Sequence, residues 1–201
     1  MKNSSTRELL RKKIVENLPV LSDVHMETIV LDRPFENIAA AFAQDLGTVL
    51  LLSGSNLDSS RYNILAVKPW LGIKSQNNAV SIKYGGKEFY TQQDPFSAIQ
   101  ALLNRFEFNH DNFDFPVLSG LFGYFAYDLK DLIEKLPSTC KETGLPDLCL
   151  YAPLIVLVQD KNSDKQTGQA TLCISILSDE LESNTKSEII NQNKKFFYDR
   201  L

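Results

Sequence analysis

The sequence predicts an α+β fold, a largely antiparallel sheet that forms half of a β-sandwich-like arrangement with helices at its periphery. Short strand-like segments follow one another between residues 25 and 90, separated by turn-forming residues. Two longer apolar segments, 150–159 and 170–177, are joined by a charged connection that is typical of a hairpin. A chain of 201 residues with 43% hydrophobic content can bury the core of one domain.

The first quarter of the chain contains two predicted helices and two predicted strands. Apolar residues recur at helical spacing over 7–17, so we expect residues 1–22 to form a helical extension of a domain spanning 23–201. Residues 25–31 predict a strand, and Pro34 fits the first turn of a short helix. Residues 48–53 are apolar without alternation, which indicates a central strand covered on both faces.

A meander is predicted next, with strands at 62–67, 71–74, 80–84 and 88–90. Its turns are expected at Lys68–Pro69, at residues 76–78 and at Gly85–Gly86. Asp94 and Pro95 then supply a cap and a first-turn proline for an amphipathic helix that reaches Phe106.

The second half of the chain begins with a glycine-punctuated aromatic segment, 120–127, which predicts a closely packed strand leading into a short helix at 128–132. After the hairpin, residues 178–180 are expected to cap a final helix that continues to the last residue. This helix has no terminating glycine or proline, a pattern that favours a chain cut at this point.

Composition excludes several classes of partner and location. The 21 Lys and Arg are interspersed with 25 Asp and Glu, giving a net charge of −4, so nucleic acid is not an expected partner. No run approaches the roughly 20 apolar residues of a membrane helix, and no signal peptide is expected. The widely spaced Cys140, Cys149 and Cys173 fit neither a disulfide framework nor a zinc motif, which indicates a cytoplasmic protein.

Candidate catalytic groups are scarce. His25 and His110 each occur alone, and His25 lies in a strand pattern that favours a structural role. His110 lies among Asp and Asn residues, where a metal site is conceivable but a solvated loop is favoured. Gly120 and Gly123 are too close together for a phosphate-binding loop, so we interpret them as packing devices. We therefore predict no catalytic residue and no metal ligand in this chain.

Three groups of segments, taken together, resemble the N-terminal domain of the chorismate-aminating synthases, the family of anthranilate synthase component I and aminodeoxychorismate synthase component I. They are residues 50–54 with 60–65 and 68–69, residues 118–128, and residues 145–147 with 154–160. The resemblance extends roughly from Val24 to Leu177. Ser53–Gly54 is closer to the aminodeoxychorismate branch, because anthranilate synthases commonly place an acidic residue before that serine.

The sequence also departs from the family pattern. Leu118–Ser119 stands where a glycine is usual, and Ser59 stands where tyrosine can precede the Ser-Arg pair. The family's Pro-Ile-Lys-Gly-Thr and Gly-Ala-Pro-Lys blocks, which belong to its catalytic half, are absent. The resemblance thus implies a structural and regulatory domain that is inactive alone and contributes to 4-amino-4-deoxychorismate formation for p-aminobenzoate and folate synthesis. Two alternatives are an anthranilate synthase domain of tryptophan synthesis and a stand-alone small-molecule-binding module.

The resemblance also implies a pocket for tryptophan or another amino-acid effector, at Ser53, Gly54, Ser60, Arg61, Tyr62 and Asn63. Arg61 suits a carboxylate and Gly54 allows close approach to the backbone. The structural alternatives are that Arg61 pairs with Asp58, that Tyr62 belongs to the core and that Ser53 ends its strand. Implied partners are the protein's own C-terminal chorismate-binding domain and a glutamine amidotransferase subunit. No cofactor is expected in this chain, whereas the absent catalytic domain would bind Mg²⁺.

Overall fold

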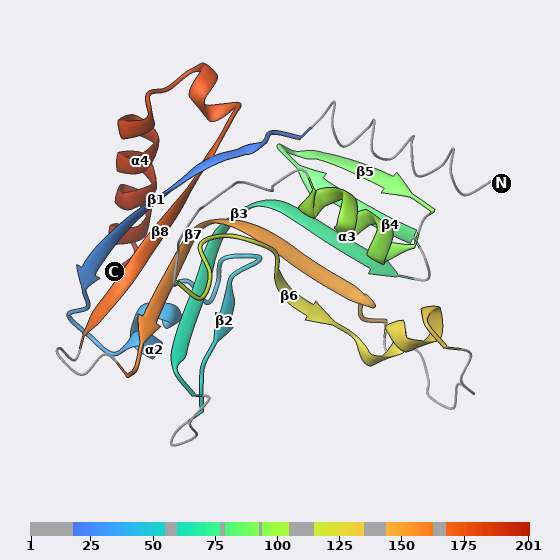
Figure 1. Ribbon diagram of the computed structural model, residues 1–201, viewed down its shortest axis with the longest axis horizontal. Helices are drawn as coiled ribbons and strands as arrows, with labels where there is room; N and C mark the ends of the chain where they lie inside the picture. Colours follow the sequence, from blue (N-terminus) through green and yellow to red (C-terminus); the bar gives the residue numbers. More distant parts are fainter. Residues whose placement is uncertain are drawn as a thin grey trace.

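The computed structural model describes residues 18–54, 60–76, 79–92, 94–104, 115–134, 144–162 and 168–201. These residues form an eight-stranded sheet in which all strand pairs are antiparallel, accompanied by a few helices (Figure 1). The predicted α+β fold class is therefore confirmed. The helix expected over 7–17 lies outside the described residues.

Along the described residues the elements occur in the order β1 (Leu21–Val30), α2 (Phe35–Ala40), β2 (Val49–Leu51), β3 (Tyr62–Gln76), β4 (Ala79–Tyr84), β5 (Lys87–Thr91), α3 (Pro95–Leu103), β6 (Phe122–Phe125), the 3₁₀ helix η1 (Tyr127–Leu132), β7 (Leu148–Asp160), β8 (Gln169–Leu177), the 3₁₀ helix η2 (Glu180–Glu182) and α4 (Lys186–Tyr198). The predicted hairpin of β7 and β8 is confirmed, as are the strand and short helix of β6 and η1. No helix within the described ranges is long and apolar enough to span a membrane.

Two long strands, β3 and β7, join the two halves of the sheet. They pair from Tyr62 opposite Asp160 to Ser75 opposite Leu148. At one end, β3 also pairs with β2 and β7 with β8, which gives a half-sheet with the order β1-β8-β7-β3-β2. At the other end the order is β6-β7-β3-β4-β5.

The junction of the halves lies where the sequence predicted a turn. Lys68 has a positive φ of 56°, and the pairing register of β3 and β7 shifts between Pro69 and Leu71. The expectation of a turn at Lys68–Pro69 is therefore wrong, because β7 stays paired with β3 on both sides and the strand bends instead of ending. Both strands curve through this region (Figure 1).

Each half of the sheet has its own hydrophobic core. The first core packs residues of β7, β8 and α2 with α4, and the rings of Phe42 and Phe197 stack with centroids 5.5 Å apart. The second packs α3, through Ala98 and Leu102, against Leu71 of β3 and neighbouring residues of β4. Asp94 caps α3 as predicted, accepting hydrogen bonds from the backbone N–H groups of the first helical turn.

The apolar run 48–53 is not the predicted central strand. β2 has only three residues and pairs with β3 alone, so it lies at the edge of its half-sheet. Leu50, Leu51 and Leu52 are 40%, 47% and 47% exposed. Apolar residues follow one another in this segment because several of them lie at the surface, and not because both faces of the strand are buried.

The cap predicted for the last helix is also wrong. Asp179 caps the short η2 instead, and α4 begins at Lys186 after a capping box formed by Thr185 and Glu188. The sequence contains two N-cap residues close together, Asp179 and Thr185. Thr185 is the better cap for α4, because the Glu188 side chain accepts a hydrogen bond from the Thr185 backbone N–H.

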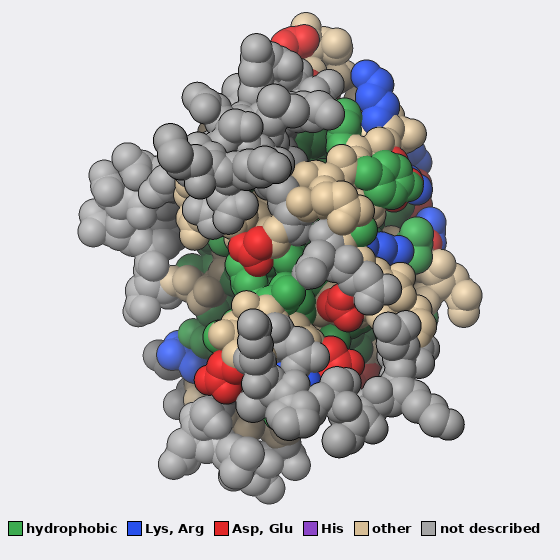
Figure 2. Space-filling view, turned by 90° about the vertical axis from the view of Figure 1, so that its right-hand side faces the viewer, with side chains coloured by type: hydrophobic (Ala, Val, Ile, Leu, Met, Phe, Trp, Pro, Cys, Tyr) green, Lys and Arg blue, Asp and Glu red, His purple; other side chains and the backbone are tan. Residues whose placement is uncertain are grey.

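Exposed aromatic side chains gather where β6 leads into η1. Phe125 stacks on Phe96 of α3 at 6.5 Å, yet Phe125 remains 54% exposed and Tyr127 is 79% exposed. Tyr124 is also exposed, whereas Phe122 is buried. We call Phe96, Tyr124, Phe125 and Tyr127 the aromatic end. Figure 2 views the molecule from the right-hand side of Figure 1, where hydrophobic side chains reach the surface beside acidic ones.

Candidate functional site

The six residues predicted to bind an effector lie close together around the start of β3. Ser53 and Gly54 follow β2, Ser60 and Arg61 precede β3, and Tyr62 and Asn63 begin it. The antiparallel register places Leu51 opposite Ile64, so the chain segments before and after residues 55–59 converge. The pairing of β2 with β3 thus assembles this group.

Asn63 connects three segments at this point. Its Oδ1 accepts a hydrogen bond from the Ser53 backbone N–H at 3.1 Å, and its Nδ2 donates to Gln159 Oε1 at 3.0 Å. The Ser53 hydroxyl donates to the carbonyl of Tyr62. Asn63 is buried, so these bonds satisfy a polar side chain that would otherwise be costly to remove from water.

Arg61 pairs with Asp160 at the end of β7. Its Nε and Nη2 donate to Asp160 Oδ2 at 3.0 and 2.9 Å, and its guanidinium lies 4.8 Å from the centroid of the Tyr62 ring. These hydrogen bonds from Arg61 lower the pKa of Asp160, outweighing the effect of partial burial. The suggested alternative partner, Asp58, lies outside the described residues.

Lys161 also contacts the residues predicted to bind an effector. Its ammonium donates to the carbonyl oxygens of Ser53 and Gly54 at 3.1 and 3.0 Å. Two adjacent residues therefore place a carboxylate on Arg61 and an ammonium on a pair of backbone carbonyls. A zwitterionic amino acid carries the same two charged groups, so Asp160 and Lys161 satisfy the contacts that such a ligand would use.

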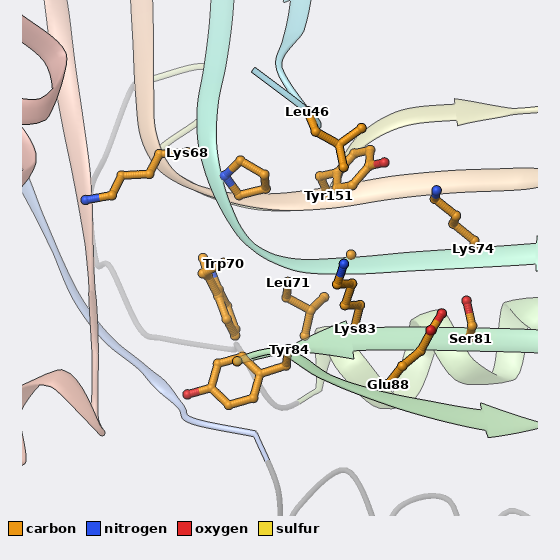
Figure 3. Close-up of a pocket in the computed structure, with 14 residues that line it drawn as sticks. Leu46, Lys68, Trp70, Leu71, Lys74, Ser81, Lys83, Tyr84, Glu88 and Tyr151 are labelled. Carbon is orange, nitrogen blue, oxygen red and sulfur yellow. The ribbon is translucent and has the colours of Figure 1, made fainter. Parts of the chain in front are cut away.

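A separate cavity of about 490 Å³ lies further along β3, in the second half of the sheet (Figure 3). Its lining includes Trp70, Gly72 and Lys74 of β3, Lys83 of β4 and Tyr151 of β7. Sequence reasoning missed it, although one signal was present: an isolated glycine inside a strand marks close approach of another group. A Cβ added to Gly72 would lie 3.2 Å from Cε1 of Tyr151.

The other candidate chemical groups do not converge. His25 lies 3.5 Å from Glu27 on β1, and His110 and Cys140 fall outside the described residues. Cys149 and Cys173 are free thiols, and burial raises the pKa of Cys173 to about 12, which keeps it protonated. Among the described residues, no three His, Cys, Asp or Glu side chains are grouped to hold a metal ion.

Comparison with known proteins gives two curated relatives. The chain is 25% identical over 144 residues to anthranilate synthase component 1 of Lactococcus lactis subsp. lactis (strain IL1403), and 33% identical over 124 residues to that of Cereibacter sphaeroides. The chain is thus similar to anthranilate synthase component 1. The alignments cover 66% and 57% of this chain but only 31% and 24% of the relatives. No model of a known protein family matches it.

A solved structure shares the fold. The crystal structure of anthranilate synthase component I from Streptococcus pneumoniae TIGR4 superposes with a TM-score of 0.51 at 18% identity, over 87% of this chain and 37% of that one. The similarity to anthranilate synthase component 1 agrees with the resemblance found in the sequence, although it does not favour the aminodeoxychorismate branch. The chain spans about a third or less of the length of its two curated relatives.

Proposed function

We propose that the chain is the N-terminal structural and regulatory domain of a cytoplasmic chorismate-aminating synthase subunit, inactive by itself. The observation that carries the proposal is the similarity to anthranilate synthase component 1 proteins of which the chain covers only 31% and 24%. In this proposal a second, C-terminal domain binds chorismate and Mg²⁺, and a glutamine amidotransferase subunit supplies ammonia. The present domain contributes a scaffold and an effector site.

Two products are candidates for the whole enzyme. Ser53–Gly54 supports aminodeoxychorismate, whereas the names of the two relatives support anthranilate. Anthranilate is fluorescent and forms without a further enzyme, so it can be followed directly. Incubating the complete protein with chorismate, Mg²⁺ and ammonia would distinguish the two products. Anthranilate fluorescence would support an anthranilate synthase. A product that becomes aromatic only after a lyase is added would support an aminodeoxychorismate synthase.

The scaffold role can be tested with a chimera. The segment of the Lactococcus relative that aligns with this chain is replaced by residues 1–201, and the deletion of that segment serves as the control. We expect the chimera to form anthranilate and the deletion variant to be inactive, because the remaining domain needs a sheet to pack against. A chimera that is folded by circular dichroism but inactive would contradict the proposal.

The effector site is proposed to hold the α-carboxylate of tryptophan or a related amino acid on Arg61 and its ammonium on the Ser53 and Gly54 carbonyls. Asp160 and Lys161 now satisfy these groups, so a ligand must compete with them. The isolated chain is therefore expected to bind tryptophan more weakly than micromolar, and the chimera, which completes the pocket, more tightly. Submicromolar tryptophan binding to the isolated chain would count against a pocket that the C-terminal domain completes.

Competition by Asp160 gives a sharper test. Asp160→Asn removes the internal carboxylate from Arg61, so calorimetric titration of the chimera should show tryptophan binding at least about threefold tighter, the scale of a partly exposed ion pair. Asp199→Asn is the matched control, because it removes the same charge from an exposed pair with Lys195 on α4. Equal affinities for the two variants would mean that Arg61 does not hold the ligand carboxylate.

A further inference from the structure

The cavity over Gly72 has a flat aromatic wall. Gly72 of β3 lies opposite Tyr151 of β7, and the ring of Tyr151 covers it: an added Cβ would lie 3.2 and 3.3 Å from two ring atoms. The same ring lies against Gly47, where an added Cβ would approach it to 2.9 Å. The absence of side chains at Gly47 and Gly72 therefore leaves room for the Tyr151 ring beside the backbone.

The far wall of the cavity presents mostly apolar surface, because the polar groups of Tyr84 and Lys68 bond to residues outside the lining. Trp70 meets Tyr84 edge-to-face at 5.9 Å, and the Tyr84 hydroxyl donates to Asp179. The Lys68 ammonium donates to Asn193 Oδ1 at 2.8 Å and points away from the cavity in Figure 3. Lys68, Trp70 and Tyr84 thus contribute methylene and ring surface to the lining. Pro69 and Leu46 add further apolar surface.

The remaining side of the cavity is cationic. Lys83 pairs with Gly72 and Lys74 with Ser81, which places the two lysines diagonally on one face of β3 and β4. In Figure 3 both ammonium groups point toward the side on which Tyr151 lies. Within the described residues neither lysine forms an ion pair, and Glu88, opposite Lys83 on β5, is the acidic residue in the lining.

We propose that this cavity binds a small aromatic carboxylate, with its ring against Tyr151 and Trp70 and its carboxylate between Lys74 and Lys83. The volume of about 490 Å³ lies in the range of small-molecule sites, which are mostly apolar with a few placed charges. Two ammonium groups against one carboxylate attract an anion in a chain whose net charge is −4. The aromatic wall favours a planar ring over a bare inorganic anion. This site is independent of the effector site at Arg61.

The test uses three probes on the purified chain, followed by amide and indole chemical shifts in ¹⁵N-resolved NMR. Benzoate has the ring and the charge, benzamide has the ring without the charge, and inorganic phosphate has the charge without the ring. Benzoate should shift the signals of Trp70, Gly72 and Tyr151 with the lowest dissociation constant of the three. Phosphate or benzamide binding as tightly as benzoate, or benzoate shifts confined to another region, would overturn the proposal.

Charge-removing variants locate the carboxylate. Lys74→Gln and Lys83→Gln should each weaken benzoate binding about two- to fivefold, as expected for losing one partly exposed ion pair. Lys195→Gln is the control, because that lysine is exposed on α4 and pairs with Asp199. Unfolding midpoints establish that the variants fold. If the two cavity variants bind benzoate as the control does, the site is not the one proposed.

Discussion

Gly123 is the residue that allows β6 to pack closely against β7. The segment containing Gly123 predicted a closely packed strand, and Gly123 has a φ of +150° with its Cα against β7. A Cβ at this position would lie 2.0 Å from the carbonyl oxygen of Cys149. The glycine is required both for its conformation and for its approach to a neighbouring strand. The sequence indicated the packing, although the partner strand comes from residues about 25 positions later in the chain.

Gly123→Ala is therefore expected to lower the free energy of unfolding by about 2 kcal/mol or more, from strain plus steric overlap. Chemical denaturation measures this change. Gly54→Ala is a suitable comparison, because an added Cβ meets no atom within 4 Å there. Similar stabilities for the two variants would show that β6 does not pack on β7 as described.

The effector group shows what local sequence leaves open. Its six residues were named from two short segments, and the structure brings those segments together. Their partners were not predictable in the same way: Gln159 and Asp160 end β7 and Lys161 follows it, about 100 residues further along. Only the long antiparallel pairing of β3 with β7 makes them neighbours. Sequence spacing suggested Asp58 as the partner of Arg61, because it is the nearest carboxylate along the chain.

At the scale of whole elements, strands at the edge and at the bend were the hardest to predict. β2 reads as a buried strand because three leucines follow one another, yet its exposure depends on whether another strand lies beside it. Lys68–Pro69 has the chemistry of a turn, yet β7 remains paired on both sides of it. Helix α3 was predicted well because its cap, its proline and its apolar face are all local.

The attachment of α4 to the sheet is predicted to depend on pH. Glu27 on β1 accepts a hydrogen bond from Lys194 of α4 at 2.7 Å. Burial alone would raise the pKa of Glu27, but the bonds from Lys194 and His25 outweigh it and lower the pKa below the ordinary 4.5. Because the folded pKa is lowered, the pair stabilises the fold above pH 4.5 and loses this effect as the pH falls through the lowered value.

Glu27→Gln should therefore lower the free energy of unfolding by about 1 kcal/mol near pH 7, and the difference from the unsubstituted protein should shrink below pH 4.5. Urea denaturation at several pH values measures it. Glu182→Gln, an exposed change in η2, is the control. If the Glu27→Gln difference in the free energy of unfolding stays constant down to acidic pH, the ionised Glu27–Lys194 pair does not stabilise the packing of α4 on β1.

Across the whole molecule, two features stand out: an edge strand with exposed leucines and the aromatic end. Groups of exposed large apolar side chains mark a surface that packs against something else. Self-association of the isolated chain is therefore expected, together with binding of an apolar dye. Phe125→Gln should reduce both in sedimentation and dye titrations, whereas Val30→Gln, exposed on β1, should not. A monomer that binds no dye would argue against a packing surface at the aromatic end.

We propose that the molecule as a whole supplies walls and contacts for a reaction whose reactive groups lie in another domain. The most direct measurement is turnover by the purified chain with chorismate, Mg²⁺ and ammonia, with the Lactococcus relative assayed in parallel. We expect the relative to form anthranilate, whereas residues 1–201 form neither anthranilate nor aminodeoxychorismate. Sustained formation of either product by the isolated chain would contradict it.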